Sequence, residues 1–201
     1  MNDYHPDLNE DRSQNVHYDF KDFPIYVRRS SLSLLKDYRF DAHFNPDCEF
    51  IYVERGTMQY RIDGNTVTLQ EHEGIFVNSG HIHYGFSNTR SESDYICILV
   101  HPSLFCTSKL MERSYVQALQ KSSGQACILF PAGSPVNHWI QSIERLRESG
   151  DPLYPVRAQL LLYQIFVELV ASLQEPDIPT EPKQYFSEMK AMLDFLERHY
   201  P

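Results

Sequence analysis

The feature that most constrains this chain is a change in hydrophobic period near residue 101. From Pro24 to His101, short runs rich in Val, Ile, Tyr and Phe alternate with turn residues, whereas apolar residues after Pro102 recur at a period close to 3.6. Closely spaced short strands are typical of a β-sandwich or β-barrel. We expect strands near 24–30, 34–43, 47–55, 57–62, 65–70, 74–78, 82–87 and 94–101.

Two turns in this region carry specific signals. Asp63-Gly64-Asn65 lies between two strand-like runs and predicts a tight hairpin, because Gly and Asn tolerate the positive φ that a two-residue turn needs. Gly56, between Arg55 and Thr57, marks another turn. The first half of the chain is therefore expected to be an antiparallel β structure.

Helices are expected after the strands. One covers 108–121, and a second, 135–149, begins at Ser134-Pro135, where Ser can cap the helix and Pro suits its first position. A third helix, 155–174, is apolar on nearly every side. Such a helix must be covered on every side, so we expect the helices between 135 and 173 to pair two copies of the chain.

The remaining segments complete the predicted domain organisation. Residues 1–20 are polar and aperiodic and predict a flexible N-terminal arm. We assign 21–105 to the barrel and 106–173 to a helical dimerisation segment. Residues 174–183 hold three prolines and three acidic residues, which is typical of a linker, and a last amphipathic helix is expected within 184–201.

The charge balance argues against nucleic-acid binding by these residues themselves. Lys and Arg total 18 against 27 Asp and Glu, a net charge of −9, whereas affinity for nucleic acid comes mostly from basic contacts to phosphates. No apolar run approaches the length of a membrane span. The N-terminus lacks the features of a signal peptide, and the four cysteines form no C-x-x-C pair, so we expect a cytoplasmic protein with free thiols.

His43, Glu49 and His83 are the polar residues that stand out within the strands. Alternation places Glu49, Ile51 and Val53 on one face of their strand, and Cys48, Phe50 and Tyr52 on the other. Both faces are mostly apolar, so Glu49 is expected to be buried or to line a pocket. A buried carboxylate needs a partner, and the two histidines are the natural candidates.

Three further residues are candidates for ligand binding. Arg39 has the same strand parity as His43, so it can face the same cavity and hold a carboxylate or sugar hydroxyls; the alternative is a surface arginine. Asn45 lies in the loop between His43 and Glu49. Tyr60 can wall a pocket, although an aromatic residue in a strand is more often plain core. The predicted ligand-binding residues are therefore Arg39, His43, Asn45, Glu49, Tyr60 and His83.

The order of His43, Glu49, Gly56, Gly74 and His83 is similar to the two cupin motifs. The longer stretch CEFIYVERGTMQYRIDGNTVTLQEHEGIFVNSGHIHYGFS, followed by YICILVHPSLFCTSKLMERSYVQAL, resembles the sensor domain of AraC-type transcriptional regulators. The tail MKAMLDFLERHYP resembles the first helix of the AraC-type DNA-binding domain. The resemblance covers about 24–200 and implies that both recognition helices lie outside these 201 residues.

The resemblance implies a mainly β plus α fold, a cupin-like (double-stranded β-helix) barrel followed by dimerisation helices. Cupin enzymes usually hold a metal with two histidines spaced by one residue, a glutamate and a distal histidine. Asn45 stands at the second histidine position, and an amide is a poor ligand for zinc or iron. We therefore expect no metal and no other cofactor, and a polar pocket or satisfied core histidines instead. A metal site is the alternative.

The expected function is the effector-sensing and dimerisation part of an AraC-type regulator, without enzymatic activity. Its partners would be a small polar effector, sugar-like by analogy with the family, a second copy of the chain, and DNA only through the missing domain. One alternative is a metal-dependent cupin enzyme such as a dioxygenase or isomerase. Another is a stand-alone truncated binding module that pairs with full-length relatives.

Overall fold

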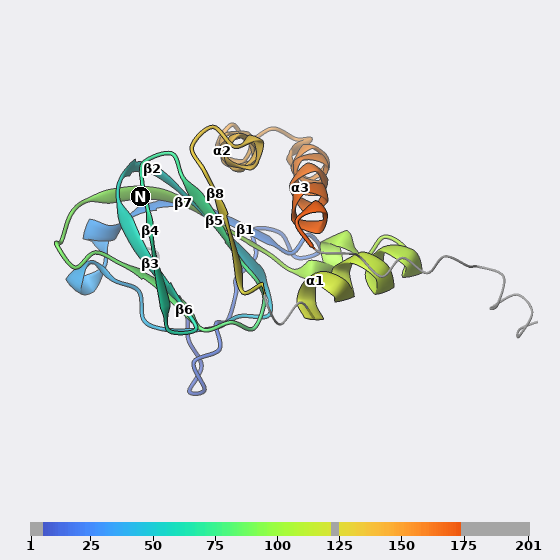
Figure 1. The fold of residues 1–201 in the computed structure, drawn as a ribbon. Helices are drawn as coiled ribbons and strands as arrows, with labels where there is room; N and C mark the ends of the chain where they lie inside the picture. The colour runs from blue at the N-terminus through green and yellow to red at the C-terminus, as the bar shows by residue number, and fades with distance from the viewer. Residues whose placement is uncertain (1–5, 122–124, 174–201) are drawn as a thin grey trace, which may run out of the picture.

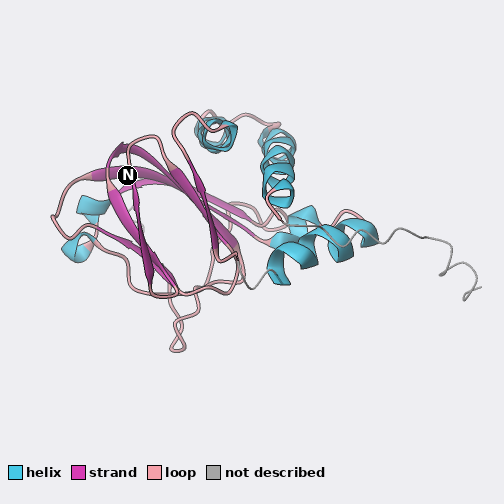
Figure 2. Ribbon diagram, viewed as in Figure 1, coloured by secondary structure: helices cyan, strands magenta, loops and turns pink. Residues whose placement is uncertain are grey.

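Two antiparallel sheets face each other in the computed structural model, which describes residues 6–121 and 125–173. Helices cover the outer face of the larger sheet (Figure 1; Figure 2). The larger sheet has the order β1 (Ile25–Ser31), β7 (Ser93–Val100), β2 (Cys48–Gly56), β5 (Gly74–Val77) and β8 (Cys127–Phe130). The smaller sheet has the order β4 (Asn65–Leu69), β3 (Met58–Ile62) and β6 (His83–Phe86).

The turn predicted at Asp63-Gly64 is confirmed. β3 and β4 pair with Ile62 opposite Asn65, and the two residues between them have positive φ values of 46° for Asp63 and 88° for Gly64. Two successive positive φ values define the type I′ turn, whose twist matches that of the flanking strands. The turn fixes the register that places Tyr60 of β3 in the barrel core.

The central strand β2 takes part in two hydrophobic cores, as its alternation predicts. Ile51 and Val53 face the space between the two sheets, which is filled by side chains from both. Phe50 and Tyr52 face the other way and pack with the helices. Glu49 lies on the same side of β2 as Ile51, and it is buried.

The second core joins the larger sheet to helices α2 (Pro135–Glu148) and α3 (Tyr154–Ala171). The predicted N-cap is confirmed, since the Ser134 hydroxyl accepts a hydrogen bond from the Val136 amide at 3.3 Å. An ion pair between Arg29 of β1 and Glu144 of α2, at 3.0 Å, also ties the helix to the sheet. No helix in the described ranges is long and apolar enough to cross a membrane.

Residues 34–43, predicted as a strand, do not form one. Two short 3₁₀ turns, Leu32–Leu34 and Lys36–Tyr38, occupy its first half, and positive φ values at Asp37 and Tyr38 break the extended backbone. Leu35 and Phe40, five residues apart, both enter the barrel core, a spacing that a regular strand cannot provide. The rest of the segment pairs with β6 only at single bridges.

Two other elements differ from the prediction. The short strand β8 was not expected, because four apolar residues beyond a helix carry little signal; it forms by pairing with the outer edge of β5. Within 108–121, the helix is a π-helical turn, Met111–Val116, followed by α1 (Gln117–Lys121). The predicted linker 174–183 and terminal helix 184–201 lie outside the described residues.

Candidate functional site

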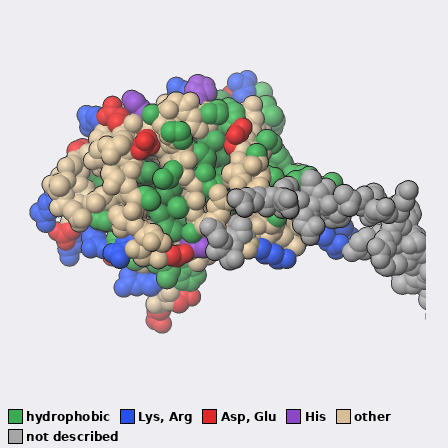
Figure 3. Space-filling view, viewed as in Figure 1, with side chains coloured by type: hydrophobic (Ala, Val, Ile, Leu, Met, Phe, Trp, Pro, Cys, Tyr) green, Lys and Arg blue, Asp and Glu red, His purple; other side chains and the backbone are tan. Residues whose placement is uncertain are grey.

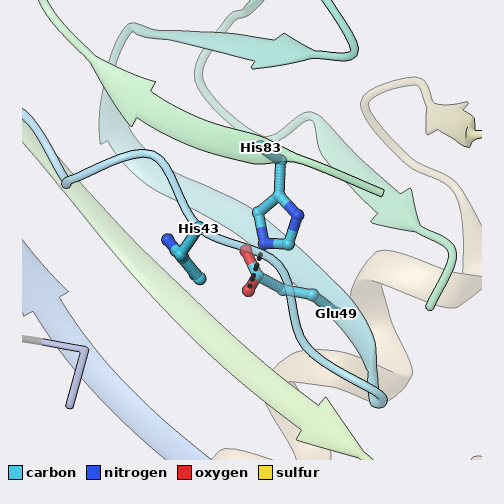
Figure 4. A group of neighbouring side chains, drawn as sticks. All are labelled: His43, Glu49 and His83. Atoms are coloured by element: carbon cyan, nitrogen blue, oxygen red, sulfur yellow. Dashed lines mark hydrogen bonds and ion pairs between the residues drawn. The ribbon is translucent and has the colours of Figure 1, made fainter. Parts of the chain in front are cut away.

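Three predicted site residues come together inside the barrel. His43 ends the loop segment that pairs with the start of β6, Glu49 is the second residue of β2, and His83 is the first residue of β6. Their relative exposures are 2%, 2% and 1%. The two imidazole rings lie 4.6 Å apart at their centroids, with the Glu49 carboxylate beside them (Figure 4).

Glu49 accepts hydrogen bonds at both carboxylate oxygens. The Tyr60 hydroxyl donates to Oε1, and His83 Nε2 lies 3.2 Å from Oε2. The other ring nitrogen of His83, Nδ1, lies 2.7 Å from the carbonyl of His81 and can only donate to it. His83 therefore has a hydrogen-bond acceptor at each nitrogen, an arrangement that suits the protonated imidazolium.

The electrostatics of the pair favour an ion pair. Burial opposes ionisation of Glu49, but the charge and hydrogen bond of His83 outweigh it and hold the pKa of Glu49 below its ordinary value. Burial also opposes protonation of His83, but Glu49 reverses the effect and raises the pKa of His83. Because the pair is buried away from water, the charged form of each residue is stable only while the other residue is present and charged.

His43 differs from His83 in two ways: its protonation state, and a ring nitrogen that has no hydrogen-bond partner among the described residues. Burial and the nearby charge of His83 lower the pKa of His43, so its ring is neutral near pH 7. Its Nδ1 lies 2.8 Å from the carbonyl of Asp41 and donates to it, which leaves Nε2 as an acceptor. That Nε2 atom is buried and has no hydrogen-bond partner among the described residues.

Asn45 connects this group to the N-terminal arm. Its side-chain amide donates to Gln14 at 3.2 Å, whereas its carbonyl oxygen Oδ1 is buried without a partner in the described part of the chain. The arm also pairs with Phe44 through the backbone: the Gln14 amide donates to Phe44 and the Phe44 amide donates to Arg12. In Figure 1, the arm is the pale blue hairpin below the barrel.

Further arm contacts reach both the loop and the helical layer. The Tyr18 hydroxyl donates to the buried carboxylate of Asp47 at 2.9 Å. Next to it, Asp19 pairs with Arg147 of α2 at 3.2 Å, and the ring of Phe20 stacks on Tyr154 of α3 at 5.7 Å. The sequence did not single out the arm residues that make these contacts, because the arm's polar composition carries no periodic signal.

Arg39 does not lie with the other predicted residues. Its side chain is exposed, and its guanidinium lies 5.1 Å from the ring centroid of Tyr84 on the barrel exterior. The parity argument that placed it with His43 is wrong, because the segment between them is not a strand. The structure thus brings together His43, Glu49, Tyr60 and His83, with Asn45 in the adjoining loop.

His43, Glu49 and His83 correspond to ligands of the metal site that cupin motifs imply. One ring nitrogen of each histidine and a carboxylate oxygen of Glu49 lie within 4.8 Å of one another, close enough for a shared cation. However, both oxygens of Glu49 already accept hydrogen bonds from Tyr60 and His83. Asn45, at the position of the second histidine in the cupin motif, donates to Gln14. The donor types fit a metal only if these hydrogen bonds are given up.

Comparison with known families decides the assignment. A model of the AraC-like ligand binding domain matches residues 35–166, more than half of the chain. The chain belongs to this family. The uncharacterized HTH-type transcriptional regulator YdeC of Bacillus subtilis (strain 168) is 26% identical to this AraC-like domain over 165 residues. The match covers 79% of this chain and 55% of YdeC, so the chain spans about half of the relative's length.

One solved structure supports the same fold. ToxT from Vibrio cholerae strain SCE256, crystallised with an unsaturated fatty acid bound, has a TM-score of 0.50 and 12% identity; the match covers 87% of this chain and 63% of ToxT. A cupin-2 domain protein from Shewanella frigidimarina has a TM-score of 0.31 and 21% identity, covering 40% and 72%. The predicted fold class, a cupin-like barrel followed by helices, is confirmed by the two sheets, the helical layer and the likeness to ToxT.

Proposed function

We propose that this AraC-like domain senses a small polar effector inside its barrel and pairs with a second copy through α2 and α3. The observation that carries the first part is the buried, unmatched acceptor His43 Nε2 within a barrel of a ligand-binding family. An unpaired buried acceptor costs free energy comparable to a lost hydrogen bond. A ligand that supplies the donor recovers this cost.

The polarity of the group indicates the chemistry of the ligand. His43 Nε2 and Asn45 Oδ1 are both acceptors without donors among the described residues, and the Glu49 carboxylate is already paired with His83. A matching ligand brings O–H or N–H donors, as the hydroxyls of a sugar or the ammonium of an amino sugar do. A simple aliphatic carboxylate, ionised near pH 7, brings none.

The arm is the proposed link between effector and helices. Gln14 and Tyr18 hold it against the loop that carries Asn45 and Asp47, while Asp19 and Phe20 hold it against α2 and α3. A ligand that engages Asn45 changes the contacts of Gln14, and the arm passes the change to the helical layer. The ligand shifts the equilibrium only by its different affinity for the two arm positions.

Exposed apolar residues support the pairing of two copies. Val156, Leu160 and Val167 recur along one side of α3 with exposures of 70%, 66% and 62%. Figure 3 shows hydrophobic side chains at the surface on the helical side of the molecule. Large exposed apolar side chains that recur along one side of a helix mark an interaction site, and a two-fold contact uses the same stripe on both copies. In the whole regulator, DNA binding belongs to the domain that follows.

A thermal-shift screen tests the effector proposal. Pentoses, hexoses and amino sugars are compared with aliphatic monocarboxylates; a donor ligand at about 100 times its Kd adds about 2.7 kcal/mol to the stability of the folded state. We expect a hit among the first group. His43→Phe, which removes the acceptor, should abolish its shift, whereas Arg39→Ala, on the exterior, should not. A hit that keeps its full shift in His43→Phe would place the binding site elsewhere.

A metal-dependent enzyme is the second candidate, favoured by the close approach of His43, Glu49 and His83. Because both Glu49 oxygens are engaged and Asn45 replaces a histidine, we expect well under one metal ion per chain in protein purified without chelator. Elemental analysis measures this directly, with a Glu49→Ala variant as control. Stoichiometric zinc, iron or nickel that disappears in the variant would favour the enzyme.

A further inference from the structure

An apolar groove lies beside the C-terminal end of α3, away from the barrel interior. It has a volume of about 440 Å³ and lies between α3 and the π-helical turn, with Met111 and Tyr115 on one side and Val167, Val170 and Leu173 on the other. Phe166 also lines it, and its ring stacks on Phe105 at 4.5 Å, so the groove rests on the helical core. An open apolar surface of this kind marks an interaction site.

The groove lies where the chain leaves α3, so the residues that follow are candidates to fill it. Leu173 lines the groove and is also the last residue before 174–201, which lie outside the described part. Ten residues, 174–183, separate it from a stretch with large apolar residues at helical spacing. These are Tyr185, Phe186, Met189, Met192, Leu193 and Leu196.

The ten residues 174–183 are long enough to let 184–200 reach the groove and short enough to keep 184–200 near it. Ten residues span at most roughly 33–36 Å when fully extended, so residues 184–200 can reach any part of a groove that Leu173 itself lines. A tether of about ten residues gives an effective concentration on the order of millimolar. A second copy must instead bind from dilute solution.

We propose that residues 184–200 dock as an amphipathic helix in the groove formed by α3 and the π-helical turn of the same chain. This is helix-in-groove recognition, in which anchors at i, i+3/i+4 and i+7 enter an apolar channel. The groove adjoins the pairing stripe and shares Val167 with it, whereas Leu160 lies about 20 Å along α3 from Leu173 at 1.5 Å per residue. Docking would fasten the segment that follows the sensor directly to the sensor's helical layer.

Hydrogen exchange followed by mass spectrometry tests the proposal on the 201-residue chain. We expect amides in 184–200 to exchange at least tenfold more slowly than the unstructured rate. Val170→Glu, in the groove, and Leu193→Glu, in the docking segment, should each remove this protection and also expose the peptide over 111–119. Val156→Glu, at the far end of α3, is the matched control and should leave both regions unchanged.

Three further readings complete the test. Protection should persist on tenfold dilution and in a Leu160→Glu background, because the contact lies within one chain. Unchanged exchange in β2 and β7 would show that the Val170→Glu variant is folded. If that variant does not fold, Leu193→Glu tests the same contact from the side of the docking segment. Exchange of 184–200 at the unstructured rate in the unmodified chain, or protection that vanishes on dilution, would overturn the proposal, the latter in favour of a second copy.

Discussion

Replacing Glu49 by alanine is expected to lower the free energy of unfolding by about 3–5 kcal/mol, the usual cost of removing one member of a buried ion pair. The substitution leaves His83 and Tyr60 buried without their shared acceptor. Urea denaturation measures the change. Asp37→Asn is the matched control, because it removes an exposed ion pair with Arg90, keeps a side chain that tolerates the positive φ at this position, and should cost less than about 1 kcal/mol. Equal losses in the two variants would contradict the buried pair.

The same pair predicts a pH profile. The pKa of Glu49 is lowered on folding, so its contribution is present above the ordinary value of 4.5 and is lost as pH falls through the lowered pKa. The pKa of His83 is raised, so its contribution is complete below the ordinary value of 6.5 and is lost as pH rises through the raised pKa. The stability difference between the unmodified chain and Glu49→Gln should therefore be largest between pH 4.5 and 6.5.

Replacing Leu160 by glutamate is expected to weaken self-association by about 100-fold or more, because a charge buried at the interface without a partner costs roughly 3 kcal/mol. Leu160 is 66% exposed and lies centrally on the apolar stripe of α3. Sedimentation equilibrium at micromolar concentration should show a dimer for the unmodified chain and a monomer for the variant.

A matched control separates the stripe from apolar surface in general. Ile82 is 55% exposed but lies next to β6, on the barrel rather than on the helices. Ile82→Glu should leave the dimer intact. A dimer that survives Leu160→Glu but not Ile82→Glu would move the interface to the barrel. An unmodified chain that is monomeric at micromolar concentration would end the pairing proposal.

Most of the fold follows from hydrophobic period. The strands β1 to β7 and the helices α2 and α3 carry clear periods of 2 and 3.6, and their positions agree with prediction to within a few residues. Residues 34–43 misled the prediction because Leu35 and Phe40 satisfy a strand-like composition, whereas positive φ at Asp37 and Tyr38 bends the chain. Such backbone conformations are set by packing and leave no reliable mark at Asp or Tyr.

The part of the candidate site that depends on the alternation of β2 could be predicted from the sequence. Alternation alone placed Glu49 on an apolar face, and the need of a buried carboxylate for partners pointed to His43 and His83. Arg39 was misplaced because its parity was counted through a segment that is not a strand. The contact of Gln14 with Asn45 joins residues 31 positions apart without any pattern that sequence reasoning can detect.

Because β2 is buried on both faces, substitutions in it should fall into two classes according to the face that they change. Its odd-numbered residues from Glu49 to Val53 face the barrel interior, and its even-numbered residues from Cys48 to Tyr52 face the helices. Conservative changes at neighbouring positions should therefore produce different defects, in ligand response at odd positions and in helix attachment at even ones. Deleting a single residue within β2 would exchange the two sets, turning the Glu49 carboxylate toward the helices and a phenyl ring toward the histidines.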